Sequence, residues 1–271
     1  MNQALTLDEL KQIELEILKQ FHEFCEAHNL RYVLAYGTLL GAVRHKGFIP
    51  WDDDIDVMMP RPDYETFVSL TMNGFGNHVK TVCHQNDAKY PYPFAKVIDT
   101  NTRLIETLIV PNRSLGVYID IFPIDGAIDP SSPEFAAFDK RLKRSWLLVQ
   151  MASMKLNKGK SMARTIIKYL TVPFARLIGP RHFIQKQTKL LTSFPYETSA
   201  FAHSAAIADL EEKPLPRDAY EGRILAPFES EMFYIPEQYD LLLRASYGDY
   251  MTLPPKEQQT TVHTFTAYRI Q

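Results

Sequence analysis

This sequence is short of cysteine, of long apolar runs and of a secretion signal. It has only 2 cysteines in 271 residues, and Cys25 and Cys83 lack the number and spacing of a disulfide framework or a zinc site, which fits a reducing compartment. No stretch approaches the roughly 18 apolar residues that cross a bilayer, and the N-terminus has no basic region of the kind that opens a signal peptide. We therefore expect a cytoplasmic protein, neither secreted nor membrane-spanning.

Apolar residues, in contrast, are plentiful. The chain is 45% hydrophobic and 12% aromatic, enough at this length to bury a sizeable core. The sequence therefore predicts one large domain, or a core with an appendage, and excludes a disordered protein.

Charge is distributed unevenly along the chain. The net charge is only -2, yet residues 140–189 carry thirteen Lys or Arg and no Asp or Glu, which leaves about -15 on the remainder. Such a segment suits an anionic membrane or substrate, and it also suits a solvated helical face set against acidic neighbours. Both interpretations stay open, with peripheral contact at the inner face of the membrane as the functional one. We expect no nucleic acid as a partner.

The first half of the chain alternates between strand and helix patterns. Thr6 to Glu9 has the spacing of a capping box and opens a helix predicted over 7–28. A strand over 31–36 then leads into a Gly37-Thr38 turn and a short helix. The remaining predicted elements are a strand at 54–59, a helix at 63–72, and strands at 79–84, 94–98, 103–106 and 118–122, the last closed by Pro123.

The second half is mainly helical in pattern. Residues 132–191 are helical and basic, with breaks expected at Gly159, Pro173 and Pro180, and a further helix is expected near 238–245. The whole order predicts an α/β (α+β) fold in which a mixed β-sheet is flanked by helices and followed by a helical C-terminal appendage.

Asp54 and Asp56 form the most informative local pattern, within Ile-Pro-Trp-Asp-Asp-Asp-Ile-Asp-Val at 49–57. On a strand both side chains share one face, and paired carboxylates repel unless a cation lies between them. Oxygen ligands suit Mg²⁺, with Mn²⁺ as an alternative. A solvated acidic loop is the competing interpretation. An EF-hand is excluded, because Val57 and Asp63 stand where it needs glycine and glutamate.

A third acid, Asp120, lies in Tyr-Ile-Asp-Ile-Phe-Pro-Ile-Asp at 118–125. Taken alone it is equally well explained as a satisfied acid at a strand end. If its strand neighbours that of Asp54, three carboxylates converge behind a Gly37-Thr38 turn whose amides can face phosphate, which is an arrangement suited to phosphoryl or nucleotidyl transfer.

These motifs resemble the LicD family of phosphocholine transferases. The similarity rests on Tyr36 to Asp56, on Ile119 to Asp125, and on Ile-Pro-Glu-Gln-Tyr-Asp at 235–240 with Tyr-Gly-Asp-Tyr-Met-Thr-Leu-Pro-Pro at 247–255. The family belongs with the nucleotidyltransferase-fold enzymes and is related to the fukutin-type transferases. The resemblance implies a nucleotidyltransferase-like catalytic core over 1–130. Residues 131–271 would then complete the active site and its acceptor side, either as an appendage or as part of one continuous domain.

The resemblance also implies a reaction: Mg²⁺-dependent transfer of phosphocholine from CDP-choline to a hydroxyl of a cell-surface glycan precursor, of the teichoic acid or lipopolysaccharide type, with release of CMP. The acceptor could be lipid-linked. Carried over by position, Asp54, Asp56 and Asp120 would be the metal-binding and catalytic acids. Gly37 and Thr38 would lie on the phosphate side, and Asp52 also matches a family acid.

Three further residues are candidates for substrate binding. Arg44 and Lys46 could neutralise the diphosphate, although ordinary surface cations would look the same. Trp51 is the first choice among several aromatics for a quaternary ammonium group, since such cations bind aromatic faces, although packing would explain it equally well.

Other functions remain as alternatives. The enzyme could transfer another CDP-linked alditol phosphate. Asp54-Ile55-Asp56 is also the Asp-x-Asp of a glycosyltransferase that uses a nucleotide sugar, although that interpretation leaves Gly37-Thr38 and Asp120 unexplained. A catalytically silent membrane- or polyanion-binding protein would use residues 140–189 as its working surface.

Overall fold

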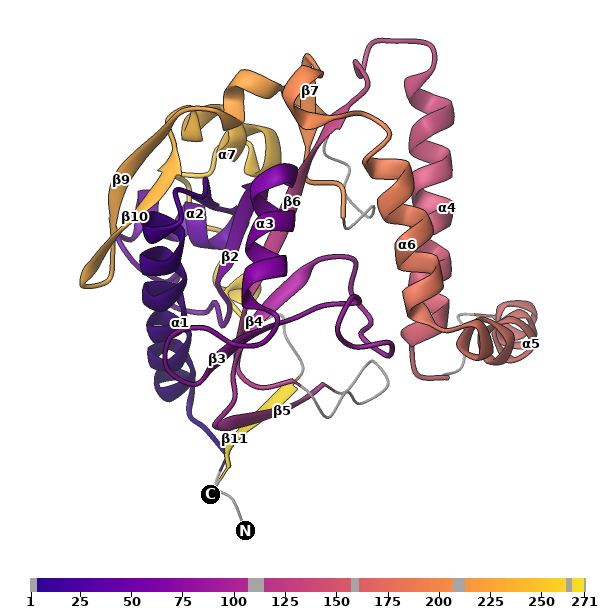
Figure 1. Ribbon diagram of the computed structural model, residues 1–271, viewed down its shortest axis with the longest axis horizontal. Coiled ribbons are helices and arrows are strands. Elements are labelled where there is room, and N and C mark those ends of the chain that lie inside the picture. Colours follow the sequence, from indigo (N-terminus) through magenta and orange to yellow (C-terminus); the bar gives the residue numbers. More distant parts are fainter. Residues whose placement is uncertain (1–3, 107–114, 157–160, 207–212, 262–264, 271) are drawn as a thin grey trace.

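The computed structural model describes residues 4–106, 115–156, 161–206, 213–261 and 265–270. A mixed β-sheet lies at its centre (Figure 1) in the order β1-β2-β6-β4-β3. The bounds are β1 Val33–Leu34, β2 Asp56–Pro60, β6 Tyr118–Ala127, β4 Ala95–Asp99 and β3 Val79–Val82. Strands β2 and β6 run parallel, and the other neighbours in this order run antiparallel. The predicted mixed sheet flanked by helices is confirmed.

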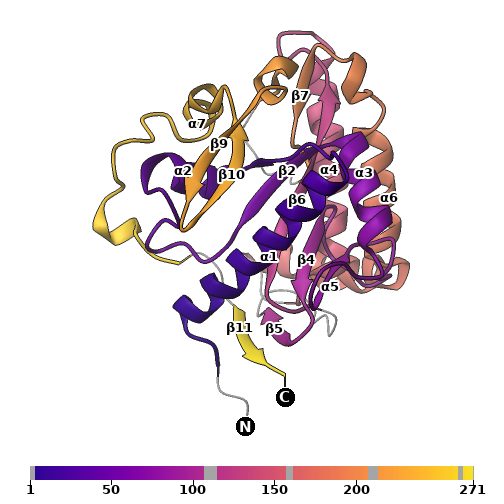
Figure 2. The same ribbon diagram turned by 60° about the vertical axis from the view of Figure 1, so that its left-hand side comes forward.

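Helices α1 (Leu7–Ala27) and α3 (Arg61–Thr71) cross the near side of the sheet in both ribbon views (Figures 1 and 2). The predicted capping box starts α1: the Thr6 hydroxyl accepts the Glu9 N–H at 3.3 Å, and the Glu9 carboxylate accepts the Thr6 N–H at 2.9 Å. Phe21 of α1 and Phe67 of α3 meet edge to face with ring centroids 5.0 Å apart. These contacts seal the main hydrophobic core on that side.

A group of three helices stands to one side of the sheet (Figure 1): α4 (Phe135–Ser153), α5 (Met162–Ile178) and α6 (Pro180–Leu191). They have small cores of their own, one of which joins Val149, Ala175, Phe183 and Ile184. Helix α5 turns away from the α4–α6 pair at its lower end in Figure 1. The described part of the basic segment at 140–189 thus belongs to this group of helices.

The rest of the second half returns to the sheet. Strands β7 (Phe201–His203) and β8 (Leu215–Pro216) extend the sheet beside the far end of β6. Strand β11 (Phe265–Arg269) pairs with β5 (Thr102–Glu106), while β9 (Arg223–Phe228) and β10 (Glu231–Pro236) form a hairpin. The remaining elements are α2 Tyr36–Arg44, α7 Tyr239–Tyr247 and the 3₁₀ helices Tyr196–Thr198, Arg217–Tyr220 and Lys256–Gln258.

Two prolines do not end elements as the sequence predicted. Pro123 lies inside β6, which continues to Ala127. The pairing with β4 ends at Ile121 and the pairing with β7 begins at Asp125, so β6 has only β2 beside it at Pro123, and the missing N–H costs no ladder bond. Pro173 likewise lies within α5, on its exposed side.

Two boundaries near the predicted site also differ from expectation. Gly37 and Thr38 do not form a separate turn, because α2 begins at Tyr36 and includes them in its first turn. Strand β2 begins at Asp56, so Asp54 lies in the loop before it and not on the strand. None of the helices in the described ranges has both the length and the hydropathy that crossing a bilayer requires.

Candidate active site

The start of α2 is fixed against the start of β2. The Thr38 hydroxyl is buried and accepts the Asp56 N–H at 2.8 Å, and the Asp56 carbonyl accepts the Ala35 N–H at 2.9 Å. Ala35, the N-cap residue, supplies no side-chain cap. The first turn of α2 therefore presents backbone N–H groups and the positive end of the helix dipole beside the acidic loop, which is an arrangement that favours an anion.

Gly37 lets the acidic loop approach α2 closely. A Cβ atom at this position would lie 2.6 Å from Asp52 Oδ2, so any larger residue would force the two apart. Carboxylate oxygens of Asp52, Asp53 and Asp54 lie within 4.8 Å of one another. The loop thus gathers three acids at the N-terminal end of α2.

Asp56 and Asp120 face each other across the parallel pair β2–β6. They are direct register partners, and the Asp120 N–H donates to the Ile55 carbonyl at 2.8 Å. Both residues are only 9% exposed. Burial, and then the charges of Asp54, Asp120 and Asp52, raise the pKa of Asp56 well above its ordinary value. The structure thus brings Asp54, Asp56 and Asp120 into one electrostatic cluster, although Asp54 reaches it from a loop.

Lys96 completes this cluster and was missed from the sequence. Its ammonium lies 2.5 Å from Asp120 Oδ1, and its side chain is 2% exposed. The same nitrogen lies 3.4 Å from the ring centroid of Tyr118 and 4.5 Å from that of Tyr92. A lysine inside the apolar run of β4 was the available signal, because lysine is rarely buried unless it is paired.

Glu14 of α1 was also missed. It is 2% exposed, and its Oε2 has no hydrogen-bond partner among the described residues. Burial raises the pKa of Glu14 well above its ordinary value, and the charges of Asp54, Asp53 and Asp120 raise it further. An acid that interrupts the buried stripe of α1 was the signal in the sequence.

The three remaining candidates, Arg44, Lys46 and Trp51, lie around the α2–β2 loop. Arg44, at the other end of α2, donates to the Tyr250 carbonyl at 2.6 Å. The exposed Lys46 ammonium donates to the Val43 carbonyl at 3.1 Å. The half-buried Trp51 ring meets the His45 ring edge to face at 6.3 Å. Arg44 thus ties α2 to the segment after α7, whereas the first turn of α2 faces the acids.

The residues present suit a divalent cation. Carboxylate oxygens of the loop acids gather within 4.8 Å of one another, and burial together with the charges of Asp54, Asp120 and Asp52 raises the pKa of Asp56. A hard cation with oxygen ligands, such as Mg²⁺ or Mn²⁺, would relieve the repulsion among these charges. Asp52, Asp54, Asp56 and Asp120 are the residues that would hold it.

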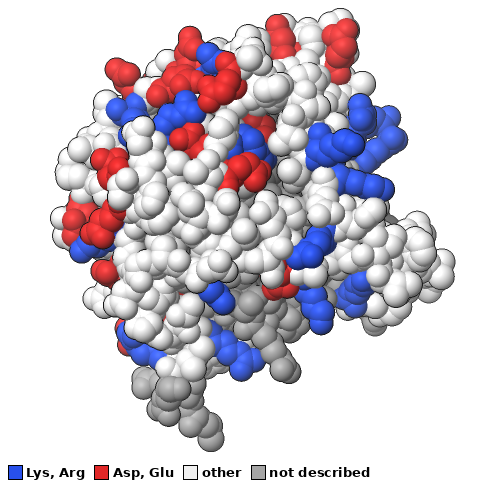
Figure 3. All heavy atoms as spheres, in the orientation of Figure 1, with Lys and Arg blue, Asp and Glu red and all other residues white. Residues whose placement is uncertain are grey.

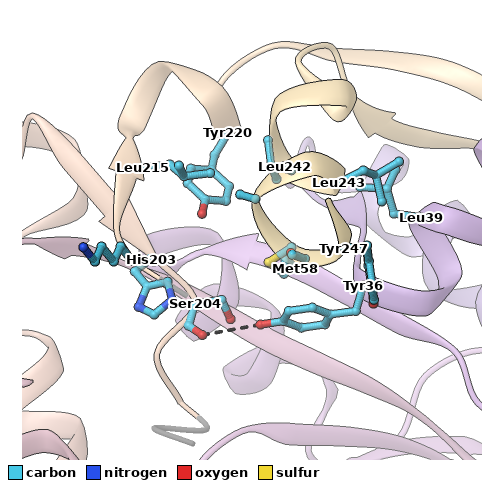
Figure 4. Close-up of a pocket in the computed structure, with 13 residues that line it drawn as sticks. Tyr36, Leu39, Met58, His203, Ser204, Leu215, Tyr220, Leu242, Leu243 and Tyr247 are labelled. Atoms are coloured by element: carbon cyan, nitrogen blue, oxygen red, sulfur yellow. Dashed lines mark hydrogen bonds between the residues drawn. The ribbon is translucent and has the colours of Figure 1, made fainter. Parts of the chain in front are cut away.

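A pocket lies on the same side of β2 as Asp56. Met58 lines its floor, and because side chains alternate along a strand, Met58 and Asp56 share a face. Figure 4 shows Tyr36 pointing across it toward Ser204, whose carbonyl accepts the tyrosine hydroxyl at 3.4 Å. The other labelled side chains are Leu39, His203, Leu215, Tyr220, Leu242, Leu243 and Tyr247. The second half of the chain thus contributes most of the wall.

Known proteins resemble this chain over nearly its whole length and over shorter stretches. The family model described as "LicD/FKTN/FKRP, nucleotidyltransferase domain" matches residues 29–130. The lipopolysaccharide cholinephosphotransferase LicD of Haemophilus influenzae is 32% identical over 273 residues, covering 97% of this chain and 98% of its own length. The chain belongs to the LicD family. Two uncharacterised proteins match over shorter stretches: one from Rickettsia typhi at 43% over 58 residues, 21% of this chain and 19% of its own, and one from Rickettsia prowazekii at 46% over 48 residues, 18% of each.

The matches to the LicD family span both parts of the candidate site. The family model covers α2, the acidic loop, β2, β4 and β6, which together carry the four aspartates and Lys96. The Haemophilus influenzae relative aligns along nearly the whole chain, so the α4–α6 helices and the pocket wall have counterparts in its length as well. Glu14 lies outside the residues that the family model matches, and it approaches the acids from α1.

Proposed function

We propose that this LicD-family chain is a Mg²⁺-dependent transferase that moves phosphocholine from CDP-choline to a hydroxyl of a lipopolysaccharide precursor and releases CMP. The observation that carries the proposal is the convergence of Asp52, Asp54, Asp56 and Asp120 beside the N-terminus of α2. Carboxylates that hold a cation, next to backbone donors for phosphate oxygens, suit transfer at phosphorus.

Different groups would act on the donor diphosphate and on the acceptor hydroxyl. The N–H groups in the first turn of α2 would bind diphosphate oxygens beside Asp52, whose carboxylate lies close to this turn because Gly37 has no Cβ. When bound, the metal would supply positive charge for the diphosphate. An acceptor hydroxyl oxygen would form a bond to the choline-bearing phosphorus while the bond to the CMP oxygen breaks, and the hydroxyl proton would pass to a carboxylate of the cluster.

Lys96 and Asp120 hold one edge of this site. The ammonium balances the charge of Asp120 and keeps its carboxylate in one orientation. The Tyr92 and Tyr118 rings lie against the same ammonium, so those faces are occupied by the chain's own cation. Trp51, half-buried at the edge of the acidic loop, is therefore the better candidate of the three for the choline head.

The acceptor side of the proposal rests on the pocket and on the relative. The pocket in Figure 4 shares the Asp56 face of β2, so an acceptor there would lie next to the acids. The Haemophilus influenzae protein is named for lipopolysaccharide, which favours that acceptor over teichoic acid. We place the reaction in the cytoplasm at the inner face of the membrane, where nucleotide-linked donors are available.

A donor panel tests the proposal. The purified chain is incubated with Mg²⁺, a lipopolysaccharide acceptor and, in separate reactions, CDP-choline, CDP-glycerol, CDP-ribitol and a UDP-sugar, and nucleotide release and phosphocholine on the acceptor are measured. We expect CMP release from CDP-choline at least tenfold above the other donors. CMP release mainly from a CDP-alditol would change the donor, and release of UDP from the UDP-sugar would contradict phosphoryl transfer altogether.

A further inference from the structure

Helix α5 exposes an apolar face along its whole length. Met162, Leu170 and Leu177 are 82%, 71% and 84% exposed. The same face continues through Ile166, Ile167, Tyr169, Phe174 and Ile178. A soluble monomer rarely leaves a contiguous apolar surface of this extent in water, so the face calls for a partner.

Helical spacing gathers these residues on one side of α5. At about 100° per residue they cover roughly half of the helix circumference. The opposite side packs on the protein, where Val172 is buried and Ala175 joins the cluster with Phe183. Arg176 also points inward, donating a hydrogen bond to the Met154 carbonyl. Among the α5 side chains that the structure describes, the exposed ones are therefore all apolar.

Exposed cations lie on α4 and α6, the two helices that contact α5. Figure 3 shows blue side chains over α4 and α6, while the end of the molecule that α5 forms is white. The exposed basic residues are Lys140, Arg141, Lys143 and Arg144 of α4, Lys155, and Lys186 and Lys189 of α6. Segment 140–189 itself contains no Asp or Glu. Of these cations, Lys143 forms an ion pair at 2.8 Å with Asp139, just before the segment. An apolar helix face with exposed cations on the neighbouring helices is typical of a surface that binds an anionic membrane.

We propose that α5 is an interfacial helix that embeds its apolar face in an anionic membrane, while the exposed cations of α4 and α6 bind lipid headgroups. Its 17 residues lie flat in this arrangement and do not span the bilayer. A second copy of the chain fits the face less well, because pairing two copies would bring their cations together. The surface is separate from the acid cluster, so the inference holds whether or not the proposed function is correct.

Vesicle flotation tests this inference with the full-length protein. Wild type is mixed with vesicles of phosphatidylcholine alone or with about one-third phosphatidylglycerol, at low and high salt. We expect binding to the anionic vesicles that weakens as salt rises, since screening reduces the headgroup attraction. Equal binding to both vesicles at both salt concentrations would overturn the role of the cations.

Two double variants separate the apolar and the charged contributions. Leu170→Ser with Leu177→Ser should reduce binding at least about tenfold, because each leucine loses its burial in lipid. Lys186→Glu with Lys189→Glu should reduce binding to the anionic vesicles only. The matched control is Leu225→Ser with Met232→Ser, which changes two exposed apolar residues of the β9–β10 hairpin and should leave binding unchanged. Serine variants of α5 that bind as wild type does would overturn the inference.

Two further measurements close the alternatives. Thermal unfolding should be nearly unchanged in all variants, because the substituted side chains are exposed. Light scattering reports the mass in solution: a wild-type dimer that floats with neither vesicle and becomes a monomer in the α5 serine variant would show that the face joins two copies, and would overturn the membrane proposal.

Discussion

At the scale of single residues, the site depends on buried charges that are tolerated only as pairs. Lys96 and Asp120 are nearly enclosed, and each is tolerated because the other is 2.5 Å away. Breaking a buried ion pair leaves an uncompensated charge in a low-dielectric environment, which costs far more than loss of an exposed pair. Asp120 has Asp56 as its register partner on the neighbouring strand, so its dependence on Lys96 is strong.

Lys96→Met should therefore destabilise the protein strongly. We expect the free energy of unfolding, measured by urea denaturation in EDTA, to fall by about 3–5 kcal/mol, because the variant leaves Asp120 buried without its cation. Lys80→Met, on neighbouring β3, is the control and should change it little. Adding Asp120→Asn to Lys96→Met should recover much of the loss. A Lys96→Met protein as stable as the Lys80 control would refute the pairing.

His203 predicts how stability changes with pH. Burial lowers its pKa from 6.5 to about 4, and its Nε2 has no hydrogen-bond partner among the described residues. The unfolded chain thus takes up this proton at a higher pH than the folded chain does. The contribution of His203 to stability is nearly complete at pH 7 and falls between about pH 6.5 and 4.

Comparison with His203→Gln isolates that contribution. Between pH 7 and 5, wild type should lose about 2 kcal/mol of unfolding free energy more than the glutamine variant does. His182→Gln, which changes an exposed histidine of α6, serves as the control and should follow wild type. Parallel pH profiles for wild type and His203→Gln would show that this histidine is not held neutral.

At the scale of elements, the β9–β10 hairpin supports the loop that carries the acids. The Glu229 N–H donates to the Lys46 carbonyl at 2.8 Å, and its carboxylate accepts the Phe48 N–H at 2.9 Å. Gly47 permits this contact, since a Cβ there would lie 2.1 Å from Glu229 Oε1. A turn near residue 229 thus holds a loop near residue 47, just before Asp52.

Glu229→Ala should loosen that loop. We expect a several-fold loss of transfer rate with only about 0.5–1.5 kcal/mol lost from stability, because the bond removed is exposed while the acids it steadies act together. Glu229→Gln keeps an acceptor oxygen and should stay near wild type. The control is Glu231→Ala, a change on the same hairpin that breaks the exposed ion pair between Glu231 and Lys19 of α1. Equal rates for the Ala and Gln variants would contradict this role.

The sequence predicted local elements better than their ends. The helix expected over 7–28 is Leu7–Ala27, since its cap and apolar stripe are local signals. The strand was predicted to end at Pro123, but a proline fits inside a strand where no neighbouring strand bonds to its backbone nitrogen. Only the tertiary fold determines which strands reach Pro123. The placement of Asp54 on a strand was also wrong, because the predicted strand was started two residues before the actual start of β2.

At the scale of the whole molecule, the site is assembled from segments far apart in the chain. The acidic motif and Asp120 could be predicted because each has a recognisable local pattern. Lys96 and Glu14 each leave only a local signal, a charge inside an apolar pattern, and it takes the folded sheet and α1 to show that they reach the same acids. The Glu229 contact and the pocket wall likewise come from residues beyond 200. The family match over nearly the full chain is consistent with a site that needs both halves.

The rate of Mg²⁺-dependent CMP release from CDP-choline, measured for wild type beside Asp56→Asn, tests the central claim most directly. Asp129→Asn, which changes an exposed acid in the turn after β6, is the control. The account predicts that Asp56→Asn folds but loses at least about a hundredfold in rate, that Asp129→Asn keeps the wild-type rate, and that EDTA abolishes the reaction. An Asp56→Asn protein that releases CMP as fast as wild type would contradict it.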